Sequence, residues 1–291
     1  MKFPWHKYEE LPLDRRNTLQ VFITNRCNLK CKGCFARHIM GENQQDISLE
    51  EYFDVVKIFK EKGGKQINIL GGEPLLHPEL EKIILLNNSC AFKTTIYTNG
   101  YYINKYNEED FHGAKLRISL YCKTGKTKSF ETLPKIKIPF DVCFMVSAKT
   151  TVSELLKTAY ALESNPFVGC KTFFISSIRE LDNERKEFFD DTEICMPVVK
   201  YKELVHEFLN RYEGDLGIDI SKRGVFESTK TLPDNKCRFA NYFIGGKIIQ
   251  CPYDVVNLNF QEDYSFGKRY CQHNNSCLMS KIKFKKINEK D

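Results

Sequence analysis

Three cysteines close together are the strongest chemical signal in the sequence. Cys27, Cys31 and Cys34 lie directly after a β-rich run at 19–24. Thiolates that gather in one loop can hold an iron–sulfur cluster, and three protein ligands on a [4Fe-4S] cluster leave one iron open. A structural zinc site that adds His38 and a chance group of buried thiols are the two alternatives.

Two short polar turns follow the next β-rich runs along the chain. The sequence GGEP at 71–74 follows the run at 67–70, and TNG at 98–100 follows the run at 93–97. Glycines let a backbone approach a ligand closely, whereas Asn99 is also an ordinary turn residue that tolerates left-handed geometry. Each turn on its own is a weak signal of a binding site.

Strands alternate with helices through most of the chain. Capping boxes that begin at Ser48 and Thr151 predict two helices, and the pattern from Tyr201 to Tyr212 predicts a third. Such alternation gives a parallel sheet with right-handed crossovers, and sites in these folds lie at the carboxyl ends of the strands. The sequence predicts an α/β fold, a partial (β/α)6 barrel, with strands at 19–24, 67–70, 93–97, 116–121, 140–146 and 171–176.

The order and positions of these segments resemble the radical S-adenosylmethionine (SAM) superfamily. The segments CNLKCKGC, GGEP and TNG match that family together, and the resemblance covers roughly residues 18–180. It implies that Cys27, Cys31 and Cys34 ligate a catalytic [4Fe-4S] cluster whose open iron binds SAM. It also implies reductive cleavage of SAM to methionine and a 5′-deoxyadenosyl radical, with a flavodoxin- or ferredoxin-type electron donor.

The same resemblance implies which residues surround SAM. The GGEP turn would contact the methionyl amino group, and Ser119, at the end of the fourth strand, would lie near the ribose or carboxylate. Many relatives carry an aromatic residue just before the third cysteine, where this chain has Gly33, and we expect Phe35 to fill that space against the adenine. The expected SAM-binding residues are Phe35, Gly71, Gly72, Glu73, Pro74, Asn99 and Ser119.

Four cysteines nearer the C-terminus predict a second metal site. The run YFIGGKIIQ is typical of a hairpin with a two-residue turn at 245–246, in which Phe243 faces Ile248 and Tyr242 faces Ile249. A glycine followed by four residues and a cysteine resembles the SPASM and Twitch extensions of radical SAM enzymes, which carry auxiliary clusters. We expect one auxiliary [4Fe-4S] cluster in the shorter Twitch style, with a four-cysteine zinc ribbon as the alternative. The four ligands would be Cys237, Cys251, Cys271 and Cys277.

The dispersed cysteines and two histidines carry weaker signals. Cys122 and Cys143 lie in or just after strands that should point toward the barrel mouth, so either is a candidate donor of a hydrogen atom to a substrate radical, or an ordinary thiol. We expect buried thiols or exposed polar side chains at the remaining positions, which are Cys90, Cys170, Cys195, His77 and His273.

Composition narrows the class of protein. The 44 basic and 38 acidic residues are mixed along the chain, without the basic stripe of a nucleic-acid-binding protein. No run approaches the roughly 18 apolar residues of a membrane helix, and no signal peptide is present. These features favour a cytoplasmic protein without nucleic-acid or membrane partners, in which the 12 cysteines serve metal or redox chemistry.

The expected organisation and activity follow from these patterns. The predicted reaction is hydrogen abstraction from a small molecule (a sugar, aminocyclitol or nucleotide-linked metabolite), which leads to oxidation or epimerisation. Only 26 residues precede Cys27, too few for a leader-binding domain, so a peptide maturase is the second hypothesis and a zinc-stabilised binding protein is the third. The expected segments are an N-terminal segment (1–17), the barrel core (18–180), a helical remainder and linker (181–230), the auxiliary-cluster extension (231–280) and a basic, solvated tail (281–291).

Overall fold

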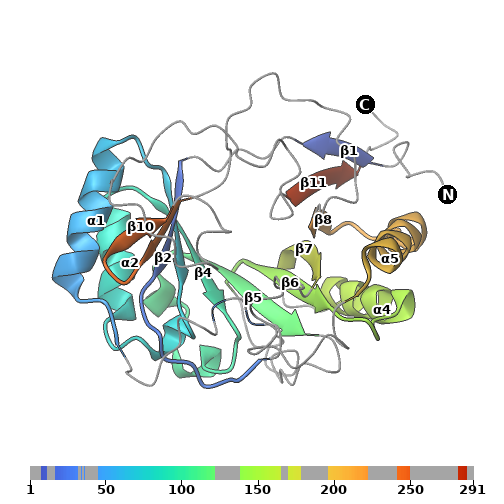
Figure 1. The fold of residues 1–291 in the computed structure, drawn as a ribbon, viewed down its shortest axis with the longest axis horizontal. Helices are drawn as coiled ribbons and strands as arrows, with labels where there is room; N and C mark the ends of the chain where they lie inside the picture. The colour runs from blue at the N-terminus through green and yellow to red at the C-terminus, as the bar shows by residue number, and fades with distance from the viewer. Residues whose placement is uncertain are drawn as a thin grey trace.

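A curved, mostly parallel sheet forms the body of the molecule (Figure 1). The described strands make one 11-stranded sheet in the order β1-β11-β8-β7-β6-β5-β4-β3-β2-β9-β10. The computed structural model describes residues 8–11, 17–31, 34, 36, 45–121, 138–164, 170–177, 196–221, 241–249 and 281–286.

Seven neighbouring strands run parallel and form the barrel wall. Six of them match the predicted runs, so the predicted fold class is confirmed. The seventh, β8, was not predicted because its sequence GIDIS offers only Ile218 and Ile220 as an alternating apolar pair. The bounds are β2 (Thr18–Phe22), β3 (Gln66–Leu70), β4 (Lys93–Thr98), β5 (Lys115–Tyr121), β6 (Phe140–Val146), β7 (Cys170–Ser177) and β8 (Gly217–Ser221).

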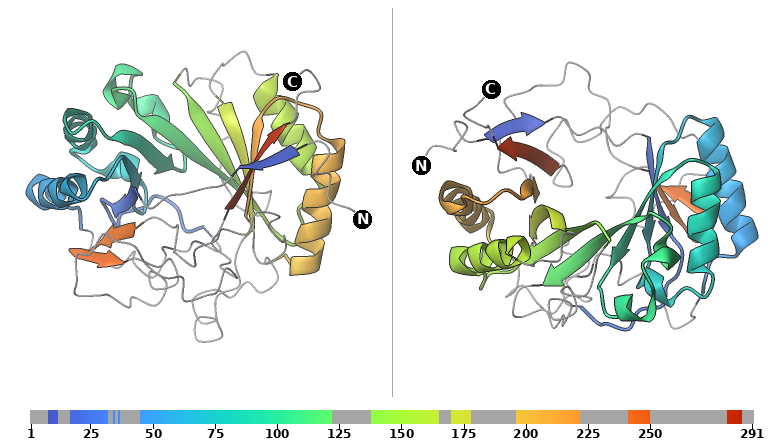
Figure 2. Two further views of the ribbon diagram at one scale, coloured as in Figure 1. Left: turned by 90° about the horizontal axis from the view of Figure 1, so that it is seen from above. Right: turned by 180° about the vertical axis from the view of Figure 1, so that it is seen from behind.

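Four described helices cover the outer face of this sheet (Figure 2). The predicted caps are confirmed, because Ser48 Oγ accepts a hydrogen bond from Glu51 N at 3.1 Å and Thr151 Oγ1 accepts one from Glu154 N at 3.2 Å. The second helix was not predicted because its N-cap residue, Glu79, makes no capping hydrogen bond. The helices are α1 (Leu49–Glu61), α2 (Leu80–Ser89), α4 (Val152–Glu163) and α5 (Val198–Arg211), and short 3₁₀ turns are η1 (Pro74–Leu76), η2 (Ile103–Lys105) and η3 (Glu109–Phe111).

The two faces of the sheet differ in composition. Outward residues such as Val21, Ile69 and Leu116 are fully buried against the helices in the main apolar core. The smaller inward cluster includes Phe22 and Leu70, near the carboxyl ends of their strands. Because side chains alternate along a strand, the residues between the outward ones face the interior of the barrel.

The hairpin lies at one edge of the sheet. Strands β9 (Asn241–Ile244) and β10 (Lys247–Ile249) pair Phe243 with Ile248 and Tyr242 with Ile249, which confirms the predicted register. Both turn glycines have positive φ, 54° at Gly245 and 76° at Gly246, as a type I′ turn requires. Strand β9 runs parallel to β2, so the hairpin extends the barrel sheet.

The opposite edge corrects one expectation. The segment 281–291 was expected to be a solvated tail, but Lys281–Lys286 forms β11, which pairs antiparallel with β8 and with β1 (Tyr8–Leu11). Lysines alternate there with Ile282 and Phe284, a strand pattern hidden by the high charge. None of the helices in the described ranges is long and apolar enough to cross a membrane.

Candidate active site

The three clustered cysteines follow the carboxyl end of β2. Cys27, Cys31 and Cys34 are each half-buried, and Cys34 packs against the inward apolar cluster. The Leu29 N–H donates to Cys27 Sγ at 3.4 Å. Burial raises the pKa of the Cys27 thiol, and the hydrogen bond from Leu29 opposes that rise. A bound metal centre would lower the pKa of the Cys27 thiol and favour its thiolate form.

This donor set fits an iron–sulfur cluster. Three half-buried thiols lie in one loop, and a backbone N–H already points at one sulfur, the type of contact that tunes cluster potentials. Among the described residues, no three Cys, His, Asp or Glu side chains gather around one point as they would at a single metal ion.

Side chains anchor this triad loop on its outer side. Arg26 Nε and Nη2 donate to the two carboxylate oxygens of Asp46 at 3.1 and 2.6 Å, and Nη2 also donates to Leu76 O at 2.6 Å. His77 is buried, contrary to expectation. Its Nδ1 accepts from Glu79 N at 3.1 Å, so Nε2 carries the proton and donates to Ile47 O at 3.1 Å. Burial lowers the pKa of His77, which favours its neutral form. The neutral ring links Ile47 to the segment that contains Glu79 through these two hydrogen bonds.

The GGEP turn lies directly against the triad loop. Gly72 N donates to Thr24 O and Glu73 N donates to Arg26 O, both at 2.8 Å. A Cβ on Gly71 would lie 2.6 Å from Thr24 O, and one on Gly72 would overlap the backbone carbonyl of Arg26. Glycine is therefore required at these positions so that the triad loop can pack against the GGEP turn. The sequence had suggested instead that these glycines make room for a ligand.

Glu73 links the GGEP turn to the TNG turn. Its fully buried carboxylate accepts hydrogen bonds from Thr98 Oγ1 at 2.7 Å, Asn99 N at 2.7 Å and Leu75 N at 3.0 Å. Burial raises the pKa of Glu73 to about 7, although these three donors lower it. The carboxylate thus joins two turns that follow adjacent strands.

Asn99 completes the connection between the three segments. Its Nδ2 donates to Asn28 Oδ1 in the triad loop at 2.9 Å, and its Oδ1 accepts from Tyr101 N at 3.0 Å. Asn99 is therefore both a turn residue and a tie to the triad loop. The triad loop, the GGEP turn and the TNG turn meet at the carboxyl edge of β2, β3 and β4.

Ser119 and Cys143 lie side by side on the inward face. They are paired residues on β5 and β6, and both are partly exposed. Cys90 and Cys170 are half-buried, and burial raises the pKa of Cys170 to about 12. The other predicted positions lie outside the described residues: Phe35, Cys122, Cys195, Cys237, Cys251, Cys271, Cys277, His38 and His273.

The same inward face carries a charged surface that the sequence did not predict. Arg117 on β5 pairs with Asp141 on β6, Nη2 to Oδ2, at 3.0 Å, and its Nη2 lies 3.8 Å from Asp219 Oδ2 on β8. Lys115 Nζ lies 2.8 Å from Asp141 Oδ1. The available signal was a set of charged residues at alternating positions within otherwise apolar strands. The inward wall is defined as Tyr97, Lys115, Arg117, Ser119, Asp141, Cys143, Phe174 and Asp219.

Aromatic rings hold the Arg117 guanidinium between them. Its Cζ lies 5.4 Å from the ring centroid of Tyr97 and 5.8 Å from that of Phe174. Burial acts to lower the pKa of Arg117, but Tyr97, Asp141 and Asp219 raise it above its usual range. Arg117 is therefore a fixed cation in the interior of the barrel.

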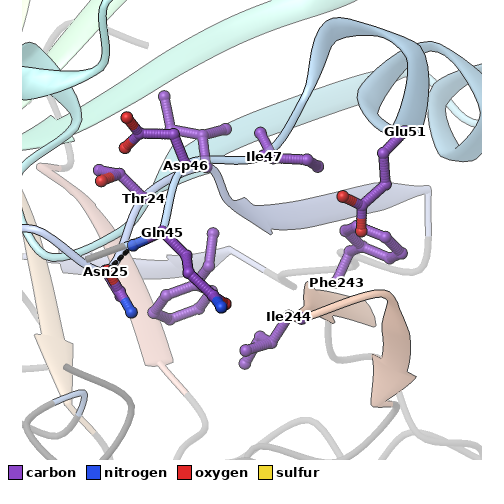
Figure 3. Close-up of a pocket in the computed structure, with 11 residues that line it drawn as sticks. Thr24, Asn25, Gln45, Asp46, Ile47, Glu51, Phe243 and Ile244 are labelled. Atoms are coloured by element: carbon purple, nitrogen blue, oxygen red, sulfur yellow. Dashed lines mark hydrogen bonds between the residues drawn. The ribbon is translucent and has the colours of Figure 1, made fainter. Parts of the chain in front are cut away.

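A hollow lies between the end of β2, the segment 45–47 and the β9–β10 hairpin (Figure 3). Its volume is about 160 Å³, below the roughly 300 to 1,000 Å³ of ordinary ligand sites. Thr24, Asn25, Asp46 and Ile244 line it, together with the start of α1 at Glu51. This hollow is too small for a molecule the size of SAM.

Sequence comparison finds relatives for part of the chain. The family model described as the radical SAM superfamily matches residues 21–191. A probable GTP 3′,8-cyclase of Archaeoglobus fulgidus is 39% identical over 94 residues, which are 31% of this chain and 30% of that protein. A GTP 3′,8-cyclase of Acidothermus cellulolyticus is 27% identical over 131 residues, 42% of this chain and 36% of that protein. The chain thus spans about a third of the length of these curated relatives.

Structural comparison finds the same fold in a protein of low sequence identity. Streptococcus suis SuiB bound to S-adenosylmethionine matches with a TM-score of 0.64 and 14% identity, over 88% of this chain and 63% of that one. SuiB bound to its precursor peptide SuiA gives the same TM-score and identity, over 88% and 64%. Because the family model spans more than half of the chain and its three motifs meet at one edge of a parallel barrel, the protein belongs to the radical SAM superfamily, whose members bind a [4Fe-4S] cluster and SAM.

Proposed function

We propose that this radical SAM enzyme abstracts a hydrogen atom from a small polar molecule bound against the inward wall. The observation that carries the proposal is the composition of that wall: charged and hydroxyl side chains lie where a barrel of purely structural role would hold apolar ones. Ser119 and Cys143 lie on the same face, one strand apart. A polar substrate would therefore lie close to the expected SAM contacts.

Different residues of this chain would hold the cluster, contact SAM and cover its adenine. Cys27, Cys31 and Cys34 would hold the catalytic cluster, which when bound supplies the electron that splits SAM into methionine and a 5′-deoxyadenosyl radical. The GGEP turn, with Asn99 and Ser119, would contact SAM, and the ties made by Glu73 would keep these contacts in register. Phe35 would cover the adenine.

An auxiliary [4Fe-4S] cluster is the second part of the proposal. Cys237 precedes β9 by four residues and Cys251 follows β10 by two, so both adjoin the open end of the confirmed hairpin along the chain. With Cys271 and Cys277 they would supply four thiols and leave no open iron. Such a cluster would accept an electron from the substrate radical in an oxidation.

Epimerisation is the alternative outcome, and it requires a hydrogen donor. Cys143 is the described candidate, because its partly exposed thiol lies beside Ser119 on the inward face; Cys122 is the other. If epimerisation occurs, Cys143→Ala or Cys122→Ala should form 5′-deoxyadenosine yet release little epimer. Full turnover by both variants would favour oxidation.

A nucleotide substrate is the second candidate, because the curated sequence relatives are named GTP 3′,8-cyclases. A peptide substrate is the third, because SuiB is described with a bound precursor peptide. GTP and short peptides should therefore be included in the substrate screen beside sugars and cyclitols. If GTP is the only compound in the screen that stimulates SAM cleavage, a nucleotide substrate would replace the sugar as the favoured hypothesis.

The deciding experiment measures 5′-deoxyadenosine. Protein reconstituted anaerobically with iron and sulfide should form it from SAM with dithionite. Replacement of Cys27, Cys31 and Cys34 by alanine should abolish it, with the loss of about four iron atoms per chain. Cys90→Ala, on the outer side against the helices, is the matched control and should retain activity. Full SAM cleavage by the triple variant, or a colourless zinc protein, would disprove the proposal.

A further inference from the structure

The side chains of Asn28 and Asn99 join the triad loop to the TNG turn beside an expected cluster ligand. Asn99 Nδ2 donates to Asn28 Oδ1 at 2.9 Å, across 71 positions of the sequence. Asn28 is the residue directly after Cys27, and Asn99 directly follows β4. This hydrogen bond therefore ties the loop to the barrel sheet next to the first of the three cysteines.

Asn99 is fixed firmly enough to serve as an anchor. Its Oδ1 accepts from Tyr101 N at 3.0 Å, and because a backbone N–H can only donate, the amide nitrogen must face Asn28. The backbone N–H of Asn99 donates to Glu73 Oε2 at 2.7 Å, and the residue is only 8% exposed. Since its backbone and both ends of its amide are held, Asn99 holds the Asn28 side chain in one orientation.

Asn28 in turn orients backbone donors toward the sulfur of Cys27. The Leu29 N–H, which donates to Cys27 Sγ at 3.4 Å, belongs to the peptide unit between Asn28 and Leu29. Burial raises the pKa of the Cys27 thiol, and backbone hydrogen bonds from Leu29 and Asn28 oppose that rise. The backbone dihedral angles of Asn28 set the direction of this peptide unit, and a side chain held at its amide oxygen restricts those angles.

The position of the triad loop as a whole has other supports. Just before Cys27, Arg26 O accepts from Glu73 N at 2.8 Å, and the Arg26 side chain donates to Asp46 and to Leu76 O. These contacts hold the loop where it leaves β2. The bond to Asn28 acts after Cys27, at the peptide unit that faces the sulfur. Its loss should therefore leave the loop in place and change the direction of the N–H groups.

We infer that Asn28, held by Asn99, is a positioning residue that raises the reduction potential of the catalytic cluster by directing backbone N–H groups at Cys27 Sγ. Hydrogen bonds to cluster sulfurs are among the factors that set this potential. A donor favours the more negatively charged state, and reduction adds one electron, so Asn28 favours the reduced form that cleaves SAM. This role rests on the proposed ligation of the cluster by the triad and is independent of the substrate.

The test is a redox titration of the reconstituted protein without SAM, followed by electron paramagnetic resonance. The signal of the catalytic cluster is the one that later addition of SAM changes. In Asn28→Ala the ratio of reduced to oxidised cluster at a fixed potential should fall at least about threefold, as for the loss of one hydrogen bond, which is about 30 mV for one electron. Asn25→Ala is the matched control in the same loop, because Asn25 Oδ1 accepts from Gln45 N instead, and its potential should equal that of the wild type.

Asn99→Ala examines the same hydrogen bond from outside the triad loop. Asn28→Ala, Asn99→Ala and the double variant should give one common shift, because removal of either partner breaks the same bond. An unshifted potential in either single variant that retains its cluster, an equal shift in Asn25→Ala, or additive shifts in the double variant would overturn the inference. Loss of cluster iron from both single variants would also overturn it, since the bond would then be needed to fold the loop. Absence of a SAM-sensitive signal in the wild type would count instead against ligation of the cluster by the triad.

Discussion

The triad loop and the inward wall are positioned by different interactions. The triad loop is held mainly by backbone contacts: Gly72 N to Thr24 O, Glu73 N to Arg26 O, and two glycines that allow the approach. The inward wall is held by side-chain ion pairs across β5, β6 and β8. Backbone contacts tolerate most substitutions, whereas side-chain pairs change with each residue. The first region suits a shared cofactor, and the second suits a particular substrate.

The largest effect is expected from a substitution of Gly72, which contacts the triad loop and not the inward wall. Gly72→Val should remove both cluster iron and 5′-deoxyadenosine formation, because its side chain would overlap Arg26 and the Cβ of Cys27. Iron content and product should be measured on the same reconstituted sample. Gly113→Ala is the control for general destabilisation: its φ of 79° strains the backbone, but its Cβ would meet no atom within 4 Å, so the cluster iron should be retained. If the variant retains its iron but binds SAM more weakly, Gly72 contacts SAM and is not needed for the packing of the triad loop.

The next largest effect lies in the inward wall. Asp141→Asn should lower the free energy of unfolding by about 3 to 5 kcal/mol, because it breaks a buried pair and leaves Arg117 and Lys115 poorly compensated. Denaturant unfolding of the apoprotein measures this loss. A change below about 1 kcal/mol, as for exposed pairs, would mean that the network is solvated.

Glu73 should make stability depend on pH. Its pKa is raised from 4.5 to about 7 in the folded protein, so the folded state holds a proton that the unfolded chain has lost between these values. The contribution of Glu73 to stability is then greatest below pH 4.5 and falls by about 3 kcal/mol as pH rises through 7. Glu73→Gln should flatten this decline between pH 5 and 8, and exposed Glu61→Gln should not. Equal slopes in Glu73→Gln and wild type would contradict the assignment.

The smallest effect is expected at the outer anchor of the triad loop. Asp46→Asn weakens a partly exposed pair with Arg26, whose bond to Leu76 O remains. Unfolding free energy should change by at most about 1 kcal/mol, with cluster iron retained after reconstitution. Loss of the cluster in this variant would show that side chains, as well as the backbone, fix the triad loop.

The sequence predicted features that depend on local patterns. Six strands, two capped helices and the hairpin register follow from alternation, capping residues and turn glycines close together in the chain. The site's scaffold was predicted only in part, because the roles of Gly72 and Glu73 depend on contacts with Arg26 and Thr98, which are distant in the sequence. The inward wall was missed because a charged residue within a strand gives no sign of its partner until neighbouring strands are aligned. Strand β11 was missed because its lysines resemble a solvated tail.

The strand pairing at the two edges of the sheet also determines when the sheet can be completed during translation. Strand β1 emerges from the ribosome well before its partner, β11 at 281–286. The free edge of β2, another early strand, is covered only when β9 at 241–244 has been made. Both edges of the nascent barrel therefore stay open until β9 and β11 have been made, and open edges invite pairing with other chains. Nascent chains that stall between these points are the form in which this protein is most prone to aggregate.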